Sequence, residues 1–149
     1  MKNFNVRVYG LLINTKNEIL VSDERRAGIS FTKFPGGGLE FGEGVVDALI
    51  REFSEELAID VSIGELFYVN DFFQVSAFDE NHQLLSFYYF VNYDNNDEIG
   101  QEEYSYPLQD DGEKQRWVAI DRLTDEDFTF PIDKKVIQKL ITDFENNDK

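Results

Sequence analysis

Three glutamates and one arginine lie close together in the stretch from Phe34 to Ile59, which reads FPGGGLEFGEGVVDALIREFSEELAI. The second half of this stretch has the apolar spacing of an amphipathic helix of about four turns. Successive helical residues are about 100° apart, so Glu52, Glu55 and Glu56 share one narrow sector of the helix surface, with Arg51 beside the first. Carboxylates gathered in this way are suited to holding a hard cation.

Without a cation, this acidic sector destabilises the helix that carries it. Like charges four residues apart, as at Glu52 and Glu56, cost about 0.2–0.5 kcal/mol per pair. Oxygen-only ligands, in a chain with no cysteine and a single histidine, favour Mg²⁺ or Mn²⁺ over zinc. The alternative is a solvated acidic face in a very acidic protein, and the spacing of the carboxylates alone favours that alternative.

The neighbouring sector of the same helix is apolar and must pack against other elements to hold the glutamates in place. Its members are Val46, Leu49, Ile50, Phe53 and Leu57.

Upstream of the helix, the sequence predicts β-structure followed by a polar loop. Phe4–Asn14 and Glu18–Ser22 are rich in branched and aromatic residues, so we expect two strands joined as a hairpin. Asp23–Thr32 is expected to be a loop that holds Arg25 and Arg26. These two cations either contact a substrate or belong to a solvated loop.

Downstream of the helix, strand and loop patterns alternate until a second helix. We expect a strand within Asp60–Asp79, a central buried strand at Leu84–Tyr93, a strand at Gln115–Asp121 and an amphipathic helix at Ile132–Phe144. Asp94–Glu113 is long for a passive connection, so it is either a functional lid or a mobile insert. The residues from Glu145 onward are expected to fray. Together these elements predict a mixed α/β or α+β fold.

Composition narrows the classes of function. A chain of 149 residues with 42% hydrophobic content is expected to form one domain over residues 1–149. The net charge of −16 repels nucleic-acid backbones and anionic membranes, so we expect neither as a partner. The chain has no signal-peptide layout, no apolar run long enough for a bilayer and no cysteine, which together predict a cytoplasmic protein.

The glycine-rich turn before the helix does not match the common phosphate-binding motifs. A P-loop needs Lys and then Ser or Thr after Gly42, where this chain has Glu43 and Gly44. The dinucleotide-binding fingerprint fails on its spacing and its βαβ context. A phosphate site here would therefore work without the P-loop lysine, and a divalent cation held by the helix carboxylates is the obvious substitute.

The full pattern from Gly37 to Ile59 resembles the Nudix box. That signature is Gly-x5-Glu-x7-Arg-Glu-U-x-Glu-Glu-x-Gly-U, with U a bulky apolar residue, and eight of its nine defined positions match here. The exception is Ala58, where the family has glycine. If the helix ends there in the left-handed conformation, alanine costs about 1 kcal/mol. The other expectation is that the helix ends one residue differently.

The resemblance implies a Nudix-like α/β/α sandwich with a mixed β-sheet between helices. It implies an enzyme, a pyrophosphohydrolase acting on acid anhydrides, which uses Mg²⁺ or Mn²⁺ to hydrolyse a nucleoside diphosphate linked to another moiety. The expected partner is therefore a small phosphorylated substrate, nucleotide-based, and a homodimer is a further expectation because homodimers are common in the family. A Nudix-fold ligand-binding or regulatory module without hydrolase activity is the alternative.

The resemblance also implies roles for residues of the box. The metal ligands would be Glu52, Glu55 and Glu56. Arg51 would hold Glu52 in orientation, and Glu43 would be a supporting acid. The catalytic set implied in this way is Glu52, Glu56, Arg51 and Glu43.

Substrate contacts are implied for the tight loop at Gly37 and Gly38, beside the phosphates. Arg25 and Arg26, just before this turn, are candidates for further contacts. The position where ADP-ribose members of the family often have proline is occupied by Val75. Substrate identity therefore stays open beyond a nucleotide or nucleotide-sugar.

The general base is open between two groups of acids. Glu52 or Glu56 could serve, or an acid from the segment that precedes the Trp117 strand. In that segment we select Asp111 and Glu113 as candidates for an additional metal ligand or base. The alternative for each of the two is a plain surface acid.

Overall fold

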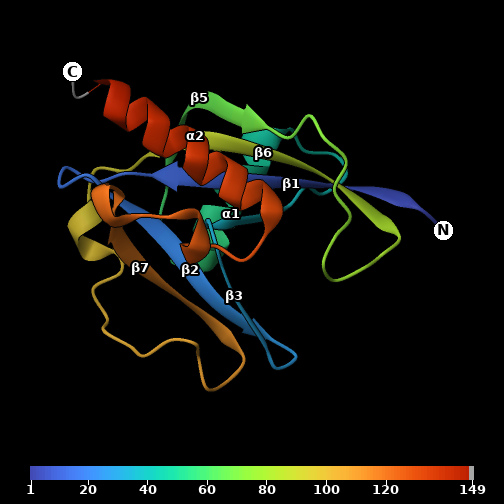
Figure 1. Ribbon diagram of the computed structural model, residues 1–149, viewed down its shortest axis with the longest axis horizontal. Helices are drawn as coiled ribbons and strands as arrows, with labels where there is room; N and C mark the ends of the chain where they lie inside the picture. The colour runs from blue at the N-terminus through green and yellow to red at the C-terminus, as the bar shows by residue number, and fades with distance from the viewer. Residues whose placement is uncertain (148–149) are drawn as a thin grey trace. The chain divides into compact units, whose positions relative to one another are not determined.

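The computed structural model describes residues 1–147, and the chain forms two compact units. The first comprises Met1–Leu12 and Pro35–Asp94, and the second comprises Ile13–Phe34 and the chain from Asn95 onward. Each unit contains one β-sheet and one α-helix (Figure 1). The mixed α+β class expected from the sequence is therefore confirmed. Within residues 1–147, no helix is long and apolar enough to cross a membrane.

The sheet of the first unit is mixed, with the strand order β4-β1-β6-β5. Its strands are β1 (Asn3–Leu12), β4 (Gly36–Gly38), β5 (Ser62–Val69) and β6 (His82–Asn92). β1 and β6 run parallel, whereas β4 and β5 pair antiparallel with their neighbours. β6 lies between β1 and β5, which confirms the central strand expected at Leu84–Tyr93. The strand expected within Asp60–Asp79 is limited to β5.

Helix α1 (Val45–Leu57) packs on β1 through Phe53. A Cβ atom added at Gly10 of β1 would come within 2.5 Å of the Phe53 ring, so glycine allows this close approach. Ala48, Leu49 and Phe53 are buried in α1. The expected apolar stripe is thus confirmed at its centre, but Val46 is 40% exposed and lies outside it. The small side chain of Ala48 takes the buried position instead.

Both ends of α1 depend on local backbone conformation. Gly44 is the N-cap residue, with φ −81° and ψ 165°. At the other end, Ala58 adopts the left-handed conformation with φ 56°, and its N–H donates to the Ser54 carbonyl at 3.0 Å. The left-handed helix end is confirmed, and alanine at this φ costs about 1 kcal/mol relative to glycine.

The second unit contains a three-stranded sheet with the order β3-β2-β7. Its strands are β2 (Glu18–Arg26), β3 (Ile29–Lys33) and β7 (Gly112–Ala119). Short 3₁₀-helices occupy Asn96–Glu98, Ile120–Arg122 and Asp125–Asp127, and α2 spans Pro131–Asn147. α2 confirms the expected second helix. It stays helical through Glu145, where we expected fraying, and the last two residues, 148–149, lie outside the described part of the chain.

The hairpin expected between the first two strands is wrong. β1 pairs with β6 over ten residue pairs in the first sheet, whereas β2 pairs with β3 and β7 in the second. An isolated bridge between Ile13 and Ile19 is the part of the expected hairpin that forms. The local turn signal at Asn14–Asn17 was correct, but long-range pairing with β6 determines where β1 belongs.

Arg25 and Arg26 lie in strand β2, and the loop expected around them is wrong. β2 and β3 form a hairpin with the two-residue turn Ala27–Gly28, whose φ angles are 51° and 78°. Two residues with positive φ match the twist of the flanking strands. Alanine rarely occupies such a position, so the sequence carried little signal for this turn.

From Asn95 onward, the segment Asp94–Glu113 is tied to the sheet of the second unit by side-chain hydrogen bonds. Trp117 Nε1 donates to the Ile99 carbonyl at 2.7 Å. Tyr104 donates its hydroxyl to the Asp23 carboxylate at 2.6 Å. These contacts tie Ile99 and Tyr104 to the sheet, and the alternatives of a functional lid and a mobile insert both stay predictions.

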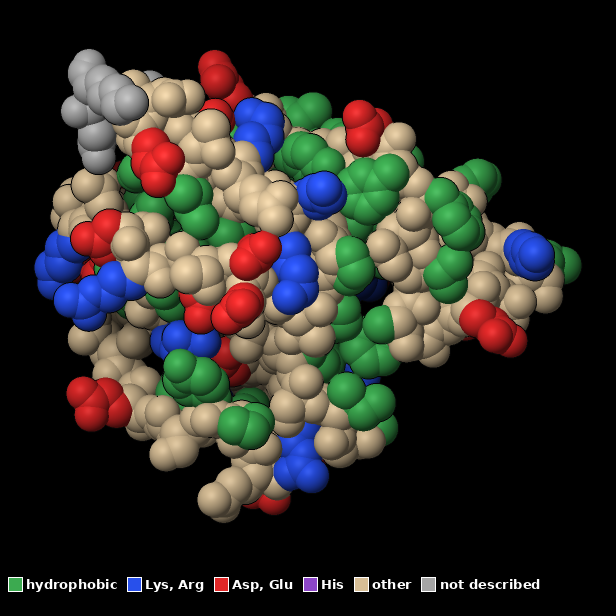
Figure 2. Space-filling model, in the orientation of Figure 1, with side chains coloured by type: hydrophobic (Ala, Val, Ile, Leu, Met, Phe, Trp, Pro, Cys, Tyr) green, Lys and Arg blue, Asp and Glu red, His purple; other side chains and the backbone are tan. Residues whose placement is uncertain are grey.

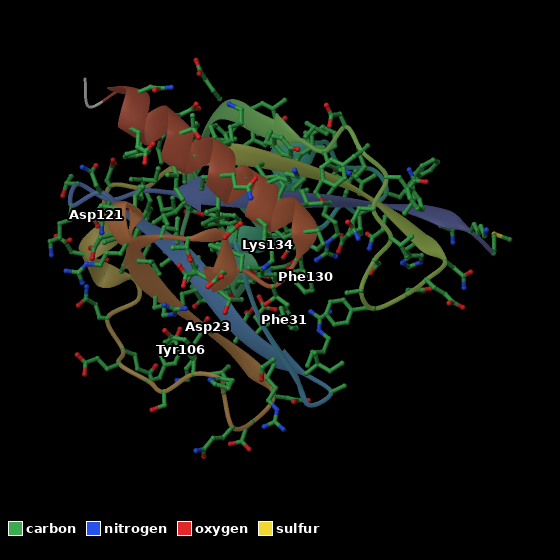
Figure 3. All side chains as sticks on the ribbon, in the orientation of Figure 1. Asp23, Phe31, Tyr106, Asp121, Phe130 and Lys134 are labelled. Carbon is green, nitrogen blue, oxygen red and sulfur yellow. The ribbon has the colours of Figure 1, made fainter. Side chains whose placement is uncertain are left out.

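A buried ion pair joins β2 to β3. Lys33 Nζ lies 2.9 Å from Glu24 Oε2, and their side chains are 5% and 7% exposed. The Ser22 hydroxyl donates to the same oxygen at 2.9 Å, and Lys33 also donates to the Phe34 carbonyl at 3.2 Å. Phe31, which is opposite Glu24 in the strand register, packs against Phe130 with the two ring centroids 5.3 Å apart (Figure 3). Because both side chains are largely removed from water, each charge of the Lys33–Glu24 pair is stabilised by the other.

Acidic and basic side chains are interspersed on the face of the molecule drawn in Figure 2. The formal charge of −16 is therefore not spread as a uniformly acidic surface over that face.

Replacing Lys33 with methionine is expected to lower the free energy of unfolding by about 3–5 kcal/mol, because the Glu24 carboxylate stays buried without its cation. Chemical denaturation at neutral pH measures the change. The double variant Glu24→Gln/Lys33→Met should recover much of the loss, since it removes both charges of the pair. A loss below about 1 kcal/mol in the single variant, the range of exposed pairs, would contradict a buried role for the pair.

Candidate active site

Arg51 of α1 is the centre of a hydrogen-bonded cluster in the first unit. Its Nε and Nη2 atoms donate to the two oxygens of Glu43, at 3.0 and 2.7 Å. Its Nη1 atom donates to Glu52 at 3.1 Å and to Glu55 at 3.2 Å. Nη2 also donates to the Gly38 carbonyl at 3.0 Å. One guanidinium thus joins three acids of the box to the glycine turn.

The bidentate contact to Arg51 keeps Glu43 ionised. Hydrogen bonding by the guanidinium, together with the Glu40 backbone N–H, lowers the pKa of Glu43 from 4.5 to about 2. The same contact raises the pKa of Arg51 above its ordinary value. Glu43 also accepts the Glu40 N–H at 2.9 Å, so its carboxylate closes the turn that precedes α1. This acid is positioned to hold the arginine, and its expected role as a supporting acid stays a prediction.

Glu52 lies directly against the glycine turn. A Cβ atom added at Gly37 would come within 2.5 Å of Glu52 Oε1 and 2.6 Å of its Cδ. The Glu52 side chain is 12% exposed, so the carboxylate is enclosed between the turn and Arg51. Glycine at position 37 therefore leaves the space that this carboxylate occupies.

The chemistry of the three helix carboxylates expected as metal ligands fits Mg²⁺ or Mn²⁺. Glu52, Glu55 and Glu56 offer carboxylate oxygens alone, which hard divalent cations prefer. In residues 1–147, no three acid or histidine side chains are arranged so as to hold a metal ion, and Arg51 supplies the counter-charge to Glu52 and Glu55. The Glu55 side chain is 60% exposed, so it can turn from Arg51 toward a cation without losing buried contacts.

The remaining candidates lie in the second unit, where the structure brings Arg25 and Asp111 together. Arg25 Nε is 3.6 Å from Asp111 Oδ1. The Asp111 carboxylate also accepts the N–H groups of Ala27 and Gly28, at 2.9 and 3.2 Å. Asp111 therefore fixes the β2–β3 turn, and its proposed role as a metal ligand or base stays a prediction.

Arg26 and Glu113 are not part of that contact. Arg26 is 63% exposed, with Nη2 4.0 Å from Glu24 Oε1 and its guanidinium 6.0 Å from the Phe31 ring centroid. Glu113 is an exposed residue near the start of β7, opposite Glu24 in the strand register. Substrate contact for Arg26 and metal binding for Glu113 stay predictions.

A second polar cluster, centred on Asp23, was not expected from the sequence. The Asp23 carboxylate, 4% exposed, accepts from Arg116 at 2.6 Å, from Tyr104 at 2.6 Å and from Thr32 at 2.6 Å. Burial and the bond to Asp23 raise the pKa of Tyr104. The sequence predicts a loop at Asp23, whereas Asp23 lies in β2, two residues after buried Val21 and on the same face of the strand.

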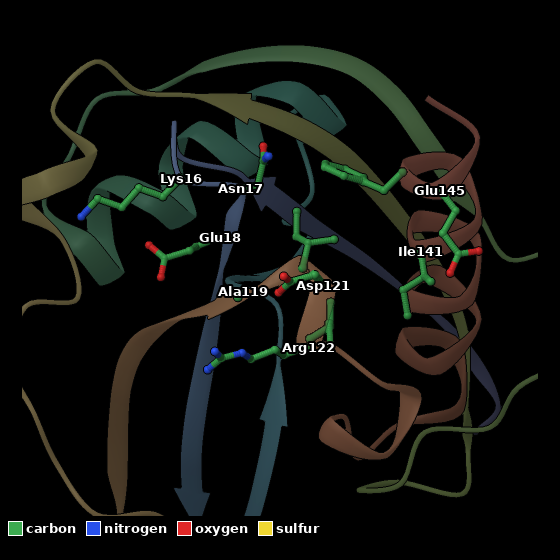
Figure 4. A pocket seen from close by; sticks show the side chains of 11 residues that line it. Lys16, Asn17, Glu18, Ala119, Asp121, Arg122, Ile141 and Glu145 are labelled. Carbon is green, nitrogen blue, oxygen red and sulfur yellow. The ribbon is translucent and has the colours of Figure 1, made fainter. Parts of the chain in front are cut away.

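Within residues 1–147, at least two hollows lie in the second unit. The larger, of about 710 Å³, is bounded by the turn before β2, the 3₁₀-helix after β7 and the end of α2, with Lys16, Glu18, Asp121, Arg122 and Glu145 among its lining residues (Figure 4). Its charged groups have both signs, and they do not define one kind of ligand. The smaller, of about 390 Å³, adjoins the Asp23 cluster.

Comparison with known proteins gives a match along nearly the whole chain. The family model described as the NUDIX domain matches residues 3–140. The 8-oxo-dGTP diphosphatase of Escherichia coli (strain K12) is 28% identical over 144 residues, covering 94% of this chain and 98% of that protein.

Solved structures show the same fold. The MutT protein from Methanosarcina mazei Go1 aligns with a TM-score of 0.69 at 18% identity, covering 99% of this chain and 97% of that one. The MutT protein from methicillin-resistant Staphylococcus aureus 252 aligns with a TM-score of 0.60 at 25% identity, covering 96% and 99%. The Nudix fold expected from the box is therefore confirmed.

Gly37→Ala is expected to displace the Glu52 carboxylate and to lower hydrolytic activity by about 10²-fold, a loss typical of misplaced catalytic groups. The readout is kcat, with the free energy of unfolding measured in parallel. Gly44→Ala is the matched control, because a Cβ atom there meets Asp47 at an ordinary 3.6 Å. Equal activity in both variants would show that Glu52 does not need the space at Gly37.

Proposed function

The chain belongs to the Nudix family, and from this premise we propose that it hydrolyses a diphosphate linkage in a nucleoside diphosphate joined to another moiety. Its class, a pyrophosphohydrolase, follows from the family and from the 8-oxo-dGTP diphosphatase at 28% identity. The proposal adds Mg²⁺ or Mn²⁺ as the cofactor and assigns the chemistry to named residues.

One observation carries the proposal: Arg51 joins Glu43, Glu52 and the Gly38 carbonyl in a single hydrogen-bonded unit. A solvated acidic face, the alternative drawn from spacing alone, would leave these carboxylates dispersed in water. Here Glu52 is enclosed beside Gly37 and held in one orientation. Such preorganisation is what a site for phosphoryl chemistry requires.

In this proposal each residue of the cluster has a separate task. Arg51 positions Glu52, and Glu43 in turn holds Arg51. Glu52, Glu55 and Glu56 would hold the divalent cation. Glu52 or Glu56 would take the proton of the attacking water as general base.

When bound, the cation would neutralise part of the diphosphate charge and polarise the phosphorus. The turn at Gly37–Gly38 offers backbone close to Glu52, so we propose that phosphate oxygens lie beside it. Asp111 and Glu113 remain proposed as an additional ligand or base, and Arg25 and Arg26 as substrate contacts.

The substrate class is proposed as a nucleotide or nucleotide-sugar. The E. coli relative carries the name of an enzyme acting on 8-oxo-dGTP, which makes that nucleotide one member of a test panel. We further propose that residues 1–149 act as one domain, because the family match spans both compact units. A cytoplasmic location and a homodimer complete the proposal.

The test is a panel of nucleoside triphosphates, 8-oxo-dGTP, dinucleoside polyphosphates and ADP-sugars, with Mg²⁺, with Mn²⁺ and with a chelator. We expect hydrolysis of at least one compound, lost on metal removal. Glu52→Gln and Glu56→Gln should each lower kcat by about 10²–10⁴-fold, since each removes a carboxylate from the reacting centre.

The matched control is Glu65→Gln, the same chemical change at an exposed residue of β5, which should leave kcat unchanged. Silence of the wild-type protein across the panel with both metals would contradict the proposal. That result would favour a Nudix-fold ligand-binding or regulatory module.

A further inference from the structure

The smaller of these two hollows of the second unit has the volume of a small-molecule site. Its volume of about 390 Å³ falls in the usual range for such pockets. We call it the Tyr106 pocket. Its lining residues include Ser30, Tyr106, Arg116, Glu126, Asp127 and Thr129. It is separate from the Arg51 cluster, none of whose residues lines it.

One wall of the Tyr106 pocket is an aromatic ring held by a cation. The guanidinium of Arg116 lies 3.9 Å from the centroid of the Tyr106 ring. Arg116 Nε is itself 2.6 Å from the buried carboxylate of Asp23, so the guanidinium beside the Tyr106 ring is anchored. Tyr106 is 56% exposed, which leaves part of its ring surface for another planar group. Aromatic rings and guanidinium planes are both good stacking partners for planar heterocycles.

The rim of the pocket is rich in hydrogen-bond acceptors. Glu126 and Asp127 are exposed acids, and an ionised carboxylate accepts hydrogen bonds without donating any. Asp127 is oriented by the Thr124 N–H, which donates to its Oδ2 atom at 2.8 Å. Thr129 Oγ1 accepts the Thr32 N–H at 2.9 Å, and so its hydroxyl proton remains to donate. A ligand must therefore bring N–H groups to most of this rim.

These features select among planar ligands. The two rim carboxylates disfavour phosphate and other anions. Arg116 forms an ion pair with Asp23, so its positive charge is compensated within the protein. Guanine, adenine and cytosine carry exocyclic amino groups at the ring edge, whereas uracil and thymine present carbonyl oxygens there.

We infer that the Tyr106 pocket binds a nucleobase that carries an amino group, stacked on Tyr106 with its amino edge toward Glu126 and Asp127. The assignment to a nucleobase, as opposed to another amino-bearing heterocycle, rests on the proposed function. It makes Tyr106 a binding residue and Glu126 a specificity-determining residue, neither of which belongs to the box.

The experiment measures binding of unphosphorylated nucleosides to the full chain by NMR chemical-shift titration, without metal. Guanosine, adenosine and cytidine should bind more tightly than uridine and thymidine, and should shift signals of Tyr106, Arg116 and Thr129. Tyr106→Ala should weaken binding of all three by about 5–150-fold, the effect of removing one stacking partner. Tyr106→Phe keeps the ring and should bind like the wild type.

Glu126→Gln should reduce the preference for amino-bearing bases, because an amide both donates and accepts. Phe73→Ala, which removes an aromatic side chain that is 68% exposed elsewhere, is the control and should bind like the wild type. Equal affinity for all five nucleosides, shifts confined to other residues, unchanged binding in Tyr106→Ala, or no binding up to the solubility limit would each overturn the inference.

The two proposals fail separately. Nucleosides that bind at Tyr106 in a protein inactive across the hydrolysis panel would retain the pocket and reject the hydrolase. Hydrolysis without nucleoside binding at Tyr106 would do the reverse.

Discussion

The contact between Arg51 and the carboxylates of its own unit is the interaction on which the candidate site depends. Four acids of this region, at positions 40, 43, 52 and 55, lie within 4.0 Å of its guanidinium. Without it, like charges would repel along one face of α1 and between that face and the glycine turn. Arginine suits this task because its planar fork donates in several fixed directions and stays charged at any working pH. The hydrogen bond from Arg51 is also the main reason why the pKa of Glu43 is low.

Two glycines give this charged cluster its place. Gly10 lets the Phe53 ring of α1 approach β1, and Gly37 leaves room for the Glu52 carboxylate. The apolar face of the helix is thereby fixed on the sheet while its acidic face meets the turn. One face of the helix therefore packs on the sheet while the neighbouring face carries the charged cluster, which explains why apolar and acidic sectors lie side by side. The left-handed end at Ala58 is tolerated because it lies beyond both.

The parts of the molecule that could be predicted from the sequence are those specified by several residues within one short stretch. The box fixes the identities of residues over a short span, so α1, its acids and the turn at Gly37 were predictable. The helical periodicity of α2 was equally clear. The pairing of β1 with β6 was not, because it joins residues about eighty positions apart and competes with a plausible local turn. The β2–β3 hairpin escaped notice because its turn uses Ala27 where asparagine or aspartate is usual. The Asp23 cluster was not predicted for the same reason, because a polar residue in an expected loop is not expected to be buried.

A Mn²⁺ titration of the ¹⁵N-labelled protein without substrate tests most directly the claim that the acids around Arg51 form a divalent-cation site. Paramagnetic broadening reports which backbone amides lie near the ion. We predict that the amide signals of Gly37, Gly38 and the Glu52–Glu56 segment broaden first, and that Mg²⁺ in excess reverses the effect. Broadening that begins instead at the acid-rich residues 94–98, or that affects the acidic surface uniformly and ignores Mg²⁺, would contradict the claim.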